Sequence, residues 1–272
     1  MPSSRPSRLT GALAALSLAV GFGLASNASA GILYGLSLDT DALYTINPTN
    51  GEATLTSTLN GDYADANLSG LAILNGTFYA SAIADANQEN YELVSINPLT
   101  GATTLVADLP NDNFFAAAGD DANGVLYLAD NQNGTLVTFD PQTSALTTVG
   151  TYDAVDIDGL AYDQAGTLYG VSFFNDELYA INAATGETTL IGPTGFEADD
   201  SIGLGFDTDT GTLYAVDGDD LYTLDTATGA ATFIGTNSDG IRFTGLDVLA
   251  VPEPALIGGL MTLGGLVLLR RR

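Results

Sequence analysis

The fold is decided by the stretch Gly159-Leu160-Ala161-Tyr162-Asp163, Thr167-Leu168-Tyr169-Gly170, Leu178-Tyr179-Ala180-Ile181-Asn182 and Thr188-Thr189-Leu190-Ile191-Gly192. The next unit repeats it as Gly203-Leu204-Gly205-Phe206-Asp207, Thr212-Leu213-Tyr214, Leu221-Tyr222-Thr223-Leu224-Asp225 and Thr232-Phe233-Ile234-Gly235. Each unit contains four runs of branched, aromatic and Thr residues separated by Gly, Asn and Asp turns, which is typical of four antiparallel strands.

The turn before the fourth run recurs at residues 51, 101, 144, 186 and 229, so the later units repeat every 42 or 43 residues. Four strands in a period of this length predict an all-β fold, a β-propeller of five four-stranded blades. Within each blade we name the strands a to d from the central axis outward. The pattern is weakest over residues 52–69 and 106–118, so the count of five depends most on the other units.

The two ends of the repeat array predict how the ring closes. The stretch Gly31-Ile32-Leu33-Tyr34 aligns with strand b, so the first unit lacks its own strand a. A spare strand a, Gly245-Leu246-Asp247-Val248-Leu249, follows the last unit. We expect this strand to complete the first blade, because an open sheet edge invites aggregation. The unit resembles the NHL- and YVTN-type propeller repeats of secreted bacterial proteins, a resemblance that implies the fold and leaves the function open.

The composition excludes most common enzyme chemistry. The chain has no Cys, no His and no Trp, and all six of its basic residues are Arg. The Ser-His-Asp triad, the thiolate nucleophile and Cys- or His-ligated zinc are therefore excluded. Carboxylates, hydroxyls, amides and backbone groups remain, and the sequence predicts no catalytic residue.

The charge is concentrated in the repeat array. Between residues 31 and 251 Arg242 is the only basic residue, whereas all 33 acidic residues except Glu253 lie there. Such a surface repels nucleic acid and anionic lipid headgroups, so we expect no nucleic-acid partner. The acids are either a solvated coat or, at a few positions, ligands for a hard cation.

Residues 1–30 are predicted to be a secretory signal peptide. Arg5 and Arg8 precede an apolar run from about Leu13 to Leu24, and Ala28 and Ala30 form an Ala-x-Ala cleavage site before Gly31. This three-part arrangement is what the export machinery recognises. The propeller domain is then expected to cover residues 31–251.

Residues 252–272 resemble the PEP-CTERM sorting signal of Gram-negative bacteria. Pro252, Glu253 and Pro254 are followed by the apolar run 255–269, which is short for a transmembrane helix, and by Arg270, Arg271 and Arg272. The resemblance implies an exosortase substrate: transient inner-membrane anchoring, removal of the tail by an exosortase-type peptidase, and delivery to the cell surface or exopolysaccharide. A plain C-terminal membrane anchor is the alternative. Both place the propeller outside the inner membrane.

Acidic and amide side chains gather in the b–c loops and in the loops that lead from strand d to the next strand a. Those loops emerge together on one face of a propeller, and their oxygens are the ligands that Ca²⁺ prefers. The best candidate calcium ligands are Asp156 and Asp158 in one cluster and Asp217, Asp219 and Asp220 in another. The alternative is that Asp and Asn simply stabilise turns, as we expect for the turn at residues 207–211. No EF-hand pattern is present.

The Leu-Tyr pairs are expected in the core, because both sides of a blade pack on neighbouring blades. Phe173, Phe174 and Asn175, together with the pair Phe114-Phe115, are instead expected to be exposed near the loop-bearing face and to contact a ligand. The sequence thus favours a secreted, non-catalytic protein that binds a glycan or a surface protein, with Ca²⁺ as its only candidate cofactor. A Ca²⁺-dependent hydrolase or lyase that uses carboxylates alone, and a propeller with no ligand of its own, are the alternatives.

Overall fold

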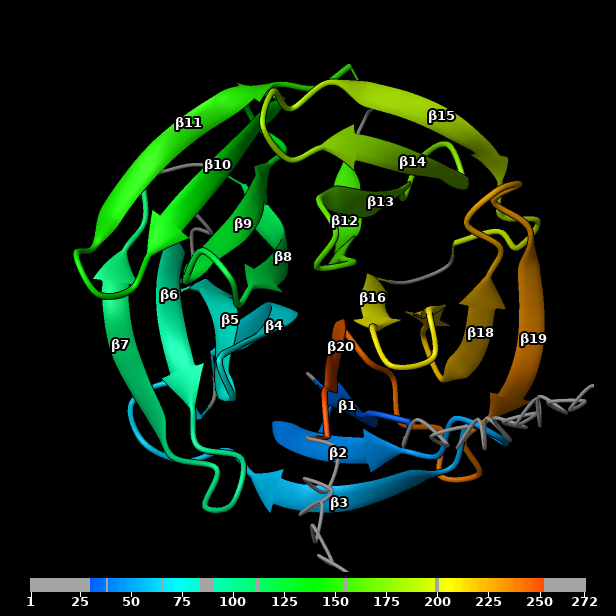
Figure 1. Cartoon of the computed structure of the whole chain (residues 1–272). Helices are drawn as coiled ribbons and strands as arrows, with labels where there is room; N and C mark the ends of the chain where they lie inside the picture. Colours follow the sequence, from blue (N-terminus) through cyan, green and yellow to red (C-terminus); the bar gives the residue numbers. More distant parts are fainter. Residues whose placement is uncertain are drawn as a thin grey trace, which may run out of the picture.

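A computed structural model describes residues 30–251 apart from residues 38, 65, 84–90, 111–112, 154–155 and 199–200. These residues form twenty strands in five four-stranded antiparallel sheets arranged around one axis (Figure 1). The all-β, five-bladed propeller is therefore confirmed. No helix within the described ranges is long and apolar enough to cross a membrane.

Each blade is a meander whose first strand lies at the axis. Blade 2 contains β4 (Asn67–Leu74), β5 (Thr77–Ile83), β6 (Tyr91–Ile96) and β7 (Thr103–Asp108). Blade 3 contains β8 (Phe114–Asp120), β9 (Val125–Asp130), β10 (Thr135–Asp140) and β11 (Ala145–Thr151). Blade 4 contains β12 (Ile157–Tyr162), β13 (Thr167–Ser172), β14 (Glu177–Asn182) and β15 (Thr188–Pro193). Blade 5 contains β16 (Ile202–Asp207), β17 (Thr212–Asp217), β18 (Asp220–Leu224) and β19 (Ala231–Thr236).

Blade 1 joins the two ends of the repeat array, as the sequence predicts. It contains β20 (Gly245–Leu249) at the axis, then β1 (Ile32–Ser37), β2 (Ala42–Ile46) and β3 (Ala53–Thr58). β20 pairs antiparallel with β1 from Ile32 opposite Leu249 to Leu36 opposite Gly245. The last strand, β20, thus pairs with the inner edge of β1, and this pairing closes the ring (Figure 1).

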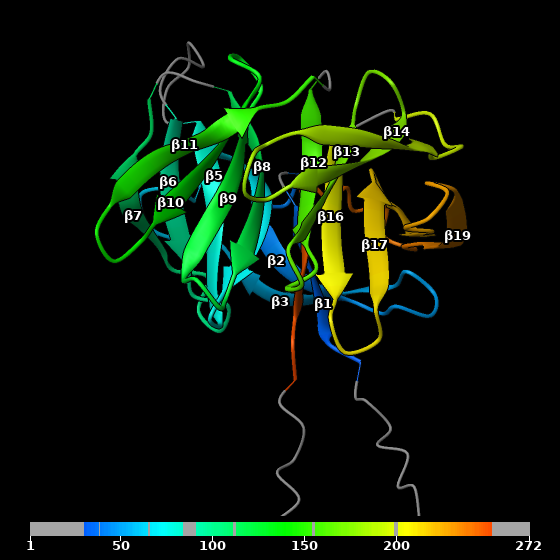
Figure 2. The same cartoon turned by 45° about the horizontal axis from the view of Figure 1, so that its top comes forward.

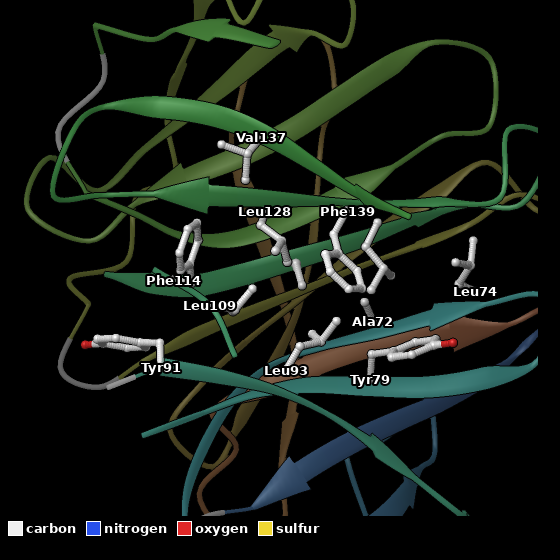
Figure 3. Packing of buried hydrophobic residues seen from close by; sticks show 12 residues of the cluster. Ala72, Leu74, Tyr79, Tyr91, Leu93, Leu109, Phe114, Leu128, Val137 and Phe139 are labelled. Atoms are coloured by element: carbon white, nitrogen blue, oxygen red, sulfur yellow. The ribbon is translucent and has the colours of Figure 1, made fainter. Parts of the chain in front are cut away.

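The hydrophobic core is divided among the seams between blades. One cluster joins Leu93 and Tyr79 of blade 2 to Leu128 and Phe139 of blade 3, and Figure 3 shows these side chains meeting between the two sheets. Four further clusters among the described residues occupy the other seams in the same way. Leu and Tyr recur in each unit because both faces of every blade need apolar side chains.

The inner strands lie so close together that small residues are required along the axis. A Cβ on Gly245 would overlap the backbone nitrogen of Leu71 in the next blade. The channel between the inner strands, at the level of Leu71 and Leu204, leaves no space for a water molecule. The two faces of the propeller are therefore not connected through its centre.

We call the face that carries the b–c and d–a loops the loop face, and the face that carries the a–b turns the turn face. β16 and β17 meet in a turn at the lower side of Figure 2, and the described chain begins and ends on that same side. The backbone N–H of Gly31 donates to Asp207, which starts this turn, over 3.2 Å. Both ends of the described chain therefore leave from the turn face.

Candidate functional site

The segment that carries Asp156 and Asp158 is held rigidly at the start of β12, on the loop face. Asn131 of blade 3 accepts a hydrogen bond from the Ile157 N–H over 2.9 Å and donates one to the Ile157 carbonyl over 3.1 Å. The same Asn131 oxygen accepts from the Tyr152 hydroxyl over 2.7 Å. Asp156 has a φ of 45°, in the left-handed region that Asp tolerates better than most residues. A neighbouring blade thus fixes the backbone between the two aspartates.

Asp158 lies beside the loop-face entrance to the narrow central channel. Burial, and then the negative charge of Asp156, raise the pKa of Asp158 to about 6. Burial and the charges of Asp130 and Asp156 also raise the pKa of Tyr152. The potential here is negative and uncompensated by any basic side chain in the described part of the chain, so a bound cation would be stabilised.

The second predicted cluster forms a tight hairpin between β17 and β18. Asp217 and Asp220 are paired across the two strands, and Gly218 has a φ of 57° at the turn. Asp220 accepts hydrogen bonds from the hydroxyls of Tyr222 and Thr236, and the Asp219 carbonyl accepts from the Asn237 N–H over 3.1 Å. Asp219 and Asp220 of this cluster therefore stabilise the hairpin and its contacts with the adjoining strand.

No group of three or more acidic side chains within the described ranges is arranged to hold a metal ion. The calcium site stays a prediction, since five further acids of the b–c and d–a loops lie outside those ranges: Asp65, Asp85, Asp112, Asp199 and Asp200. Several described acids have structural roles instead. Asp130 accepts from Asn133 and Thr135, Asp176 accepts from the Ala198 N–H, and Asp39 pairs with Arg242 over 2.7 Å.

The aromatic candidates divide into two groups. The side chain of Phe174 is 66% exposed, Asn175 is exposed, and Phe173 is half-buried with its ring against Phe174 at a centroid distance of 5.4 Å. These three residues form an accessible patch on the β13–β14 loop. The expectation of an exposed Phe114 is wrong: it is 1% exposed, because β8 starts earlier than the degenerate sequence pattern indicates and places this ring in the seam with blade 2.

Sequence reasoning missed a cavity on the turn face. Its volume is about 440 Å³, and Asp247 of β20 is among the residues that line it. The available signal was the inner-strand residue that pairs with a Tyr of the next strand in every blade. Four blades have Ala72, Ala118, Ala161 or Gly205 at this position, and only blade 1 has an acid.

The predicted targeting residues are not placed by the structure. Ala28 and the sorting motif, Pro252, Glu253, Pro254, Arg270, Arg271 and Arg272, lie outside the described residues. Ala30 is exposed at the start of the described chain. The signal peptide and the sorting signal therefore stay predictions.

The architecture defines a β-propeller repeat protein with five blades. The chain belongs to the family described as a repeat of unknown function (DUF6923), which matches residues 10–149 and again residues 107–239. No curated protein matches the chain.

Solved structures are similar in fold at low sequence identity. A chain in the crystal structure of a nidogen/laminin complex has 13% identity and a TM-score of 0.53, over 82% of this chain and 99% of that one. A structural genomics protein of unknown function from Bacteroides thetaiotaomicron has 16% identity and a TM-score of 0.52, over 80% of this chain. This chain spans 64% of that protein. At these identities the similarity concerns the fold alone.

Proposed function

We propose that this chain is an exported, non-catalytic binding protein of the bacterial cell surface or exopolysaccharide matrix, and that its loop face binds a glycan or a surface protein. The observation that carries the proposal is the position of the chain ends. Residues 30 and 251 both lie on the turn face, so attachment through the segment after residue 251 leaves the loop face pointing away from the anchor. That face carries Asp156, Asp158 and the patch of Phe173, Phe174 and Asn175.

The loop face has the features of a binding surface. Phe174 offers an exposed aromatic ring of the kind that stacks on sugars or fills a partner's pocket, and Asn175 beside it offers amide hydrogen bonds. Asp156 and Asp158 add negative charge in the adjacent loop of the same blade, where the Phe173 N–H donates to the Asp156 carbonyl over 3.1 Å and Asn131 holds the backbone of Ile157. Ca²⁺ bound to these carboxylates would supply a bridge to sugar hydroxyls, since it accepts six to eight oxygen ligands.

Retention on the producing bacterium's exopolysaccharide tests the proposal. We expect the double variant Asp156→Ala/Asp158→Ala and the single variant Phe174→Ala each to lower the bound fraction at least about tenfold, which corresponds to the loss of one well-placed contact. Asp209→Ala is the matched control, because Asp209 is exposed on the turn face. Unchanged retention in both loop-face variants, or equal loss in the control, would contradict the proposal.

A Ca²⁺-dependent carboxylate hydrolase or lyase is the alternative, and one observation favours it. Asp158 has a pKa raised to about 6 beside the carboxylate of Asp156, and a carboxyl group with a raised pKa next to a second carboxylate is the usual general acid of glycoside hydrolysis. Turnover of a glycoside panel that is lost in Asp158→Asn would replace the binding proposal with this one.

A further inference from the structure

The turn face contains a cavity of about 440 Å³ at the lower end of the central channel. All five blades contribute to its wall, because each a–b turn and the end of β20 surround the axis there. Its lining includes Asn75, Asp121, Gln164, Tyr162, Phe206 and Asp247. The volume lies in the range of small-molecule sites, and the mixture of aromatic and polar groups is also typical of them.

Asp247 is the unusual member of this lining. Its carboxylate accepts hydrogen bonds from the Ile73 N–H over 2.6 Å and from the Val248 N–H over 2.7 Å, so it is fixed at the junction of β20 and β4. Burial raises its pKa to about 7, although the two N–H groups act in the opposite direction. A carboxylate in this position costs free energy whenever it is ionised and has no cation beside it.

Among the described residues, no basic side chain lines the cavity to balance this charge. Arg242, the only Arg between residues 31 and 251, has an exposed side chain and binds Asp39 at 2.8 and 2.7 Å, in the loop that precedes β20 on the loop face. Asp121 is close enough to raise the pKa of Asp247 further. A positively charged ligand would therefore be favoured in the cavity, because it would stabilise the ionised form of Asp247.

The polar rim is already ordered by bonds between blades. The Asn75 N–H donates to Asp121 over 2.6 Å, the Asp121 N–H donates to the Gln164 side-chain oxygen over 3.3 Å, and the Gln164 amide donates to the Gly119 carbonyl over 2.8 Å. Phe206, whose ring stacks on Tyr169 at 5.8 Å, and Tyr162 contribute aromatic surface. A rim fixed in this way binds a ligand with little further loss of conformational entropy.

We propose that this cavity binds a small organic ammonium ion, with its charged nitrogen at Asp247 and Asp121 and its carbon chain against Tyr162 and Phe206. A bare metal ion would use neither the volume nor the aromatic wall, whereas an ammonium group can donate to both carboxylates and lie against an aromatic ring. A neutral polyol would leave the Asp247 charge unbalanced. This site is on the face opposite to the proposed glycan or protein surface, so the two proposals stand or fall separately.

Calorimetric titration of the full-length chain, purified in a non-ionic detergent, tests the proposal. The probe is putrescine, and butane-1,4-diol is the neutral molecule of the same length and shape. At ionic strength matched with NaCl we expect one putrescine per chain and no heat from the diol. Asp247→Asn and Asp121→Asn each keep an acceptor oxygen, and we expect each to weaken putrescine binding at least about tenfold, because a charge-assisted hydrogen bond becomes a neutral one.

Asp209→Asn is the matched control, since it removes a charge from the same face outside the cavity lining. It should bind putrescine as the unmodified chain does. Absence of binding, equal binding of the diol, equal weakening in the control, or displacement of putrescine by equimolar Ca²⁺ would each overturn the proposal. If Asp247→Asn does not fold, Asp121→Asn decides, and its melting temperature shows that it is folded.

Discussion

In every blade one residue of the inner strand, strand a, is paired with a tyrosine of strand b. These inner-strand residues are Ala72, Ala118, Ala161, Gly205 and Asp247. The small residues allow the inner strands to approach one another around the axis. Asp247 occupies the same place in the strand that closes the ring, and it bonds across the seam to the Ile73 N–H. At this repeated position blade 1 therefore has an acid where the other four blades have Ala or Gly.

The raised pKa values of Asp247 and Asp158 predict how stability depends on pH. Each group binds a proton more tightly in the folded chain than at its ordinary value of 3.8, so the folded state holds more protons than the unfolded state between the two values. The free energy of unfolding should therefore fall as pH rises, from about 4 to about 7 for Asp247 and from about 4 to about 6 for Asp158. The slope should approach about 1.4 kcal/mol per pH unit for each group.

Denaturant unfolding between pH 4 and pH 8 separates the two groups. Asp247→Asn should flatten the stability profile most between pH 6 and pH 7, where the contribution of Asp158 is already decreasing. Asp158→Asn should reduce the slope mainly below pH 6, where Asp247 still contributes, and should change the interval between pH 6 and pH 7 only slightly. A profile between pH 6 and pH 7 that is flat in the unmodified chain would contradict the assignment to Asp247.

At the scale of the elements, the turn between strands c and d explains the repeat that is visible in the sequence. Its last residue has a positive φ in every blade: 77° at Gly51, 72° at Gly101, 57° at Ser144, 76° at Gly186 and 81° at Gly229. Each c–d strand pair also has a bulge at the same register. The turn residue thus has a conformational requirement, which Ser144 meets without glycine.

Gly101 has a second requirement that the sequence does not reveal. Its turn packs on the end of β3 in blade 1, where the Asn60 N–H donates to the Gly101 carbonyl over 2.9 Å. A Cβ on Gly101 would overlap the Thr58 carbonyl oxygen. The outer seam between two blades therefore depends on close approach of their backbones.

Gly101→Ala tests this contact, and Gly124→Ala is its control. Gly124 has a φ of 68° and open space around its Cβ position, so its replacement should cost only the conformational penalty, about 1 kcal/mol. Gly101→Ala should cost at least about 2 kcal/mol more, because the seam must open, and this difference should lower Tm by roughly 4–8 °C. Equal melting temperatures for the two variants would show that the seam adapts to the extra carbon.

At the scale of the whole molecule, ring closure divides the surface into two independent faces. β20 closes the ring, the inner strands leave no passage along the axis, and both ends of the described chain lie on the turn face. A ligand on the loop face and a ligand in the turn-face cavity therefore cannot meet. Two binding events on one chain would be coupled only through the stability of the ring.

Calcium binding on the loop face can be measured through the stability of the whole propeller. If the predicted site exists, Ca²⁺ at about 100 times its dissociation constant should stabilise the protein by about 2.7 kcal/mol, which raises Tm by several degrees. The thermal melt is compared in Ca²⁺, in EDTA and in Mg²⁺ at matched ionic strength. Asp156→Ala/Asp158→Ala should abolish the shift if this pair is the site. The same shift with Mg²⁺ or NaCl would identify a solvated acidic coat.

The sequence alone determined the repeat, the strand order, the blade count and the closing strand. These features follow from local rules: turn residues at fixed spacing, apolar residues on both faces of each strand, and an unpaired strand at each end of the array. The exclusion of His- and Cys-based chemistry needs only composition. Asp156 and Asp158 could also be suggested from the sequence, because it places two carboxylates two residues apart at the start of an inner strand.

Only the tertiary structure decided which side chains meet. Phe114 was expected at the surface and is in a seam, since the start of β8 depends on its pairing with β9 and not on its own pattern. Asp217 and Asp220 became partners in a hairpin, with Asp220 bonded to Tyr222 and Thr236. The turn-face cavity combines residues from all five blades that are far apart in the chain. Asp247 lies there because closing the ring places β20 against β4, and contacts made by ring closure have no local signature.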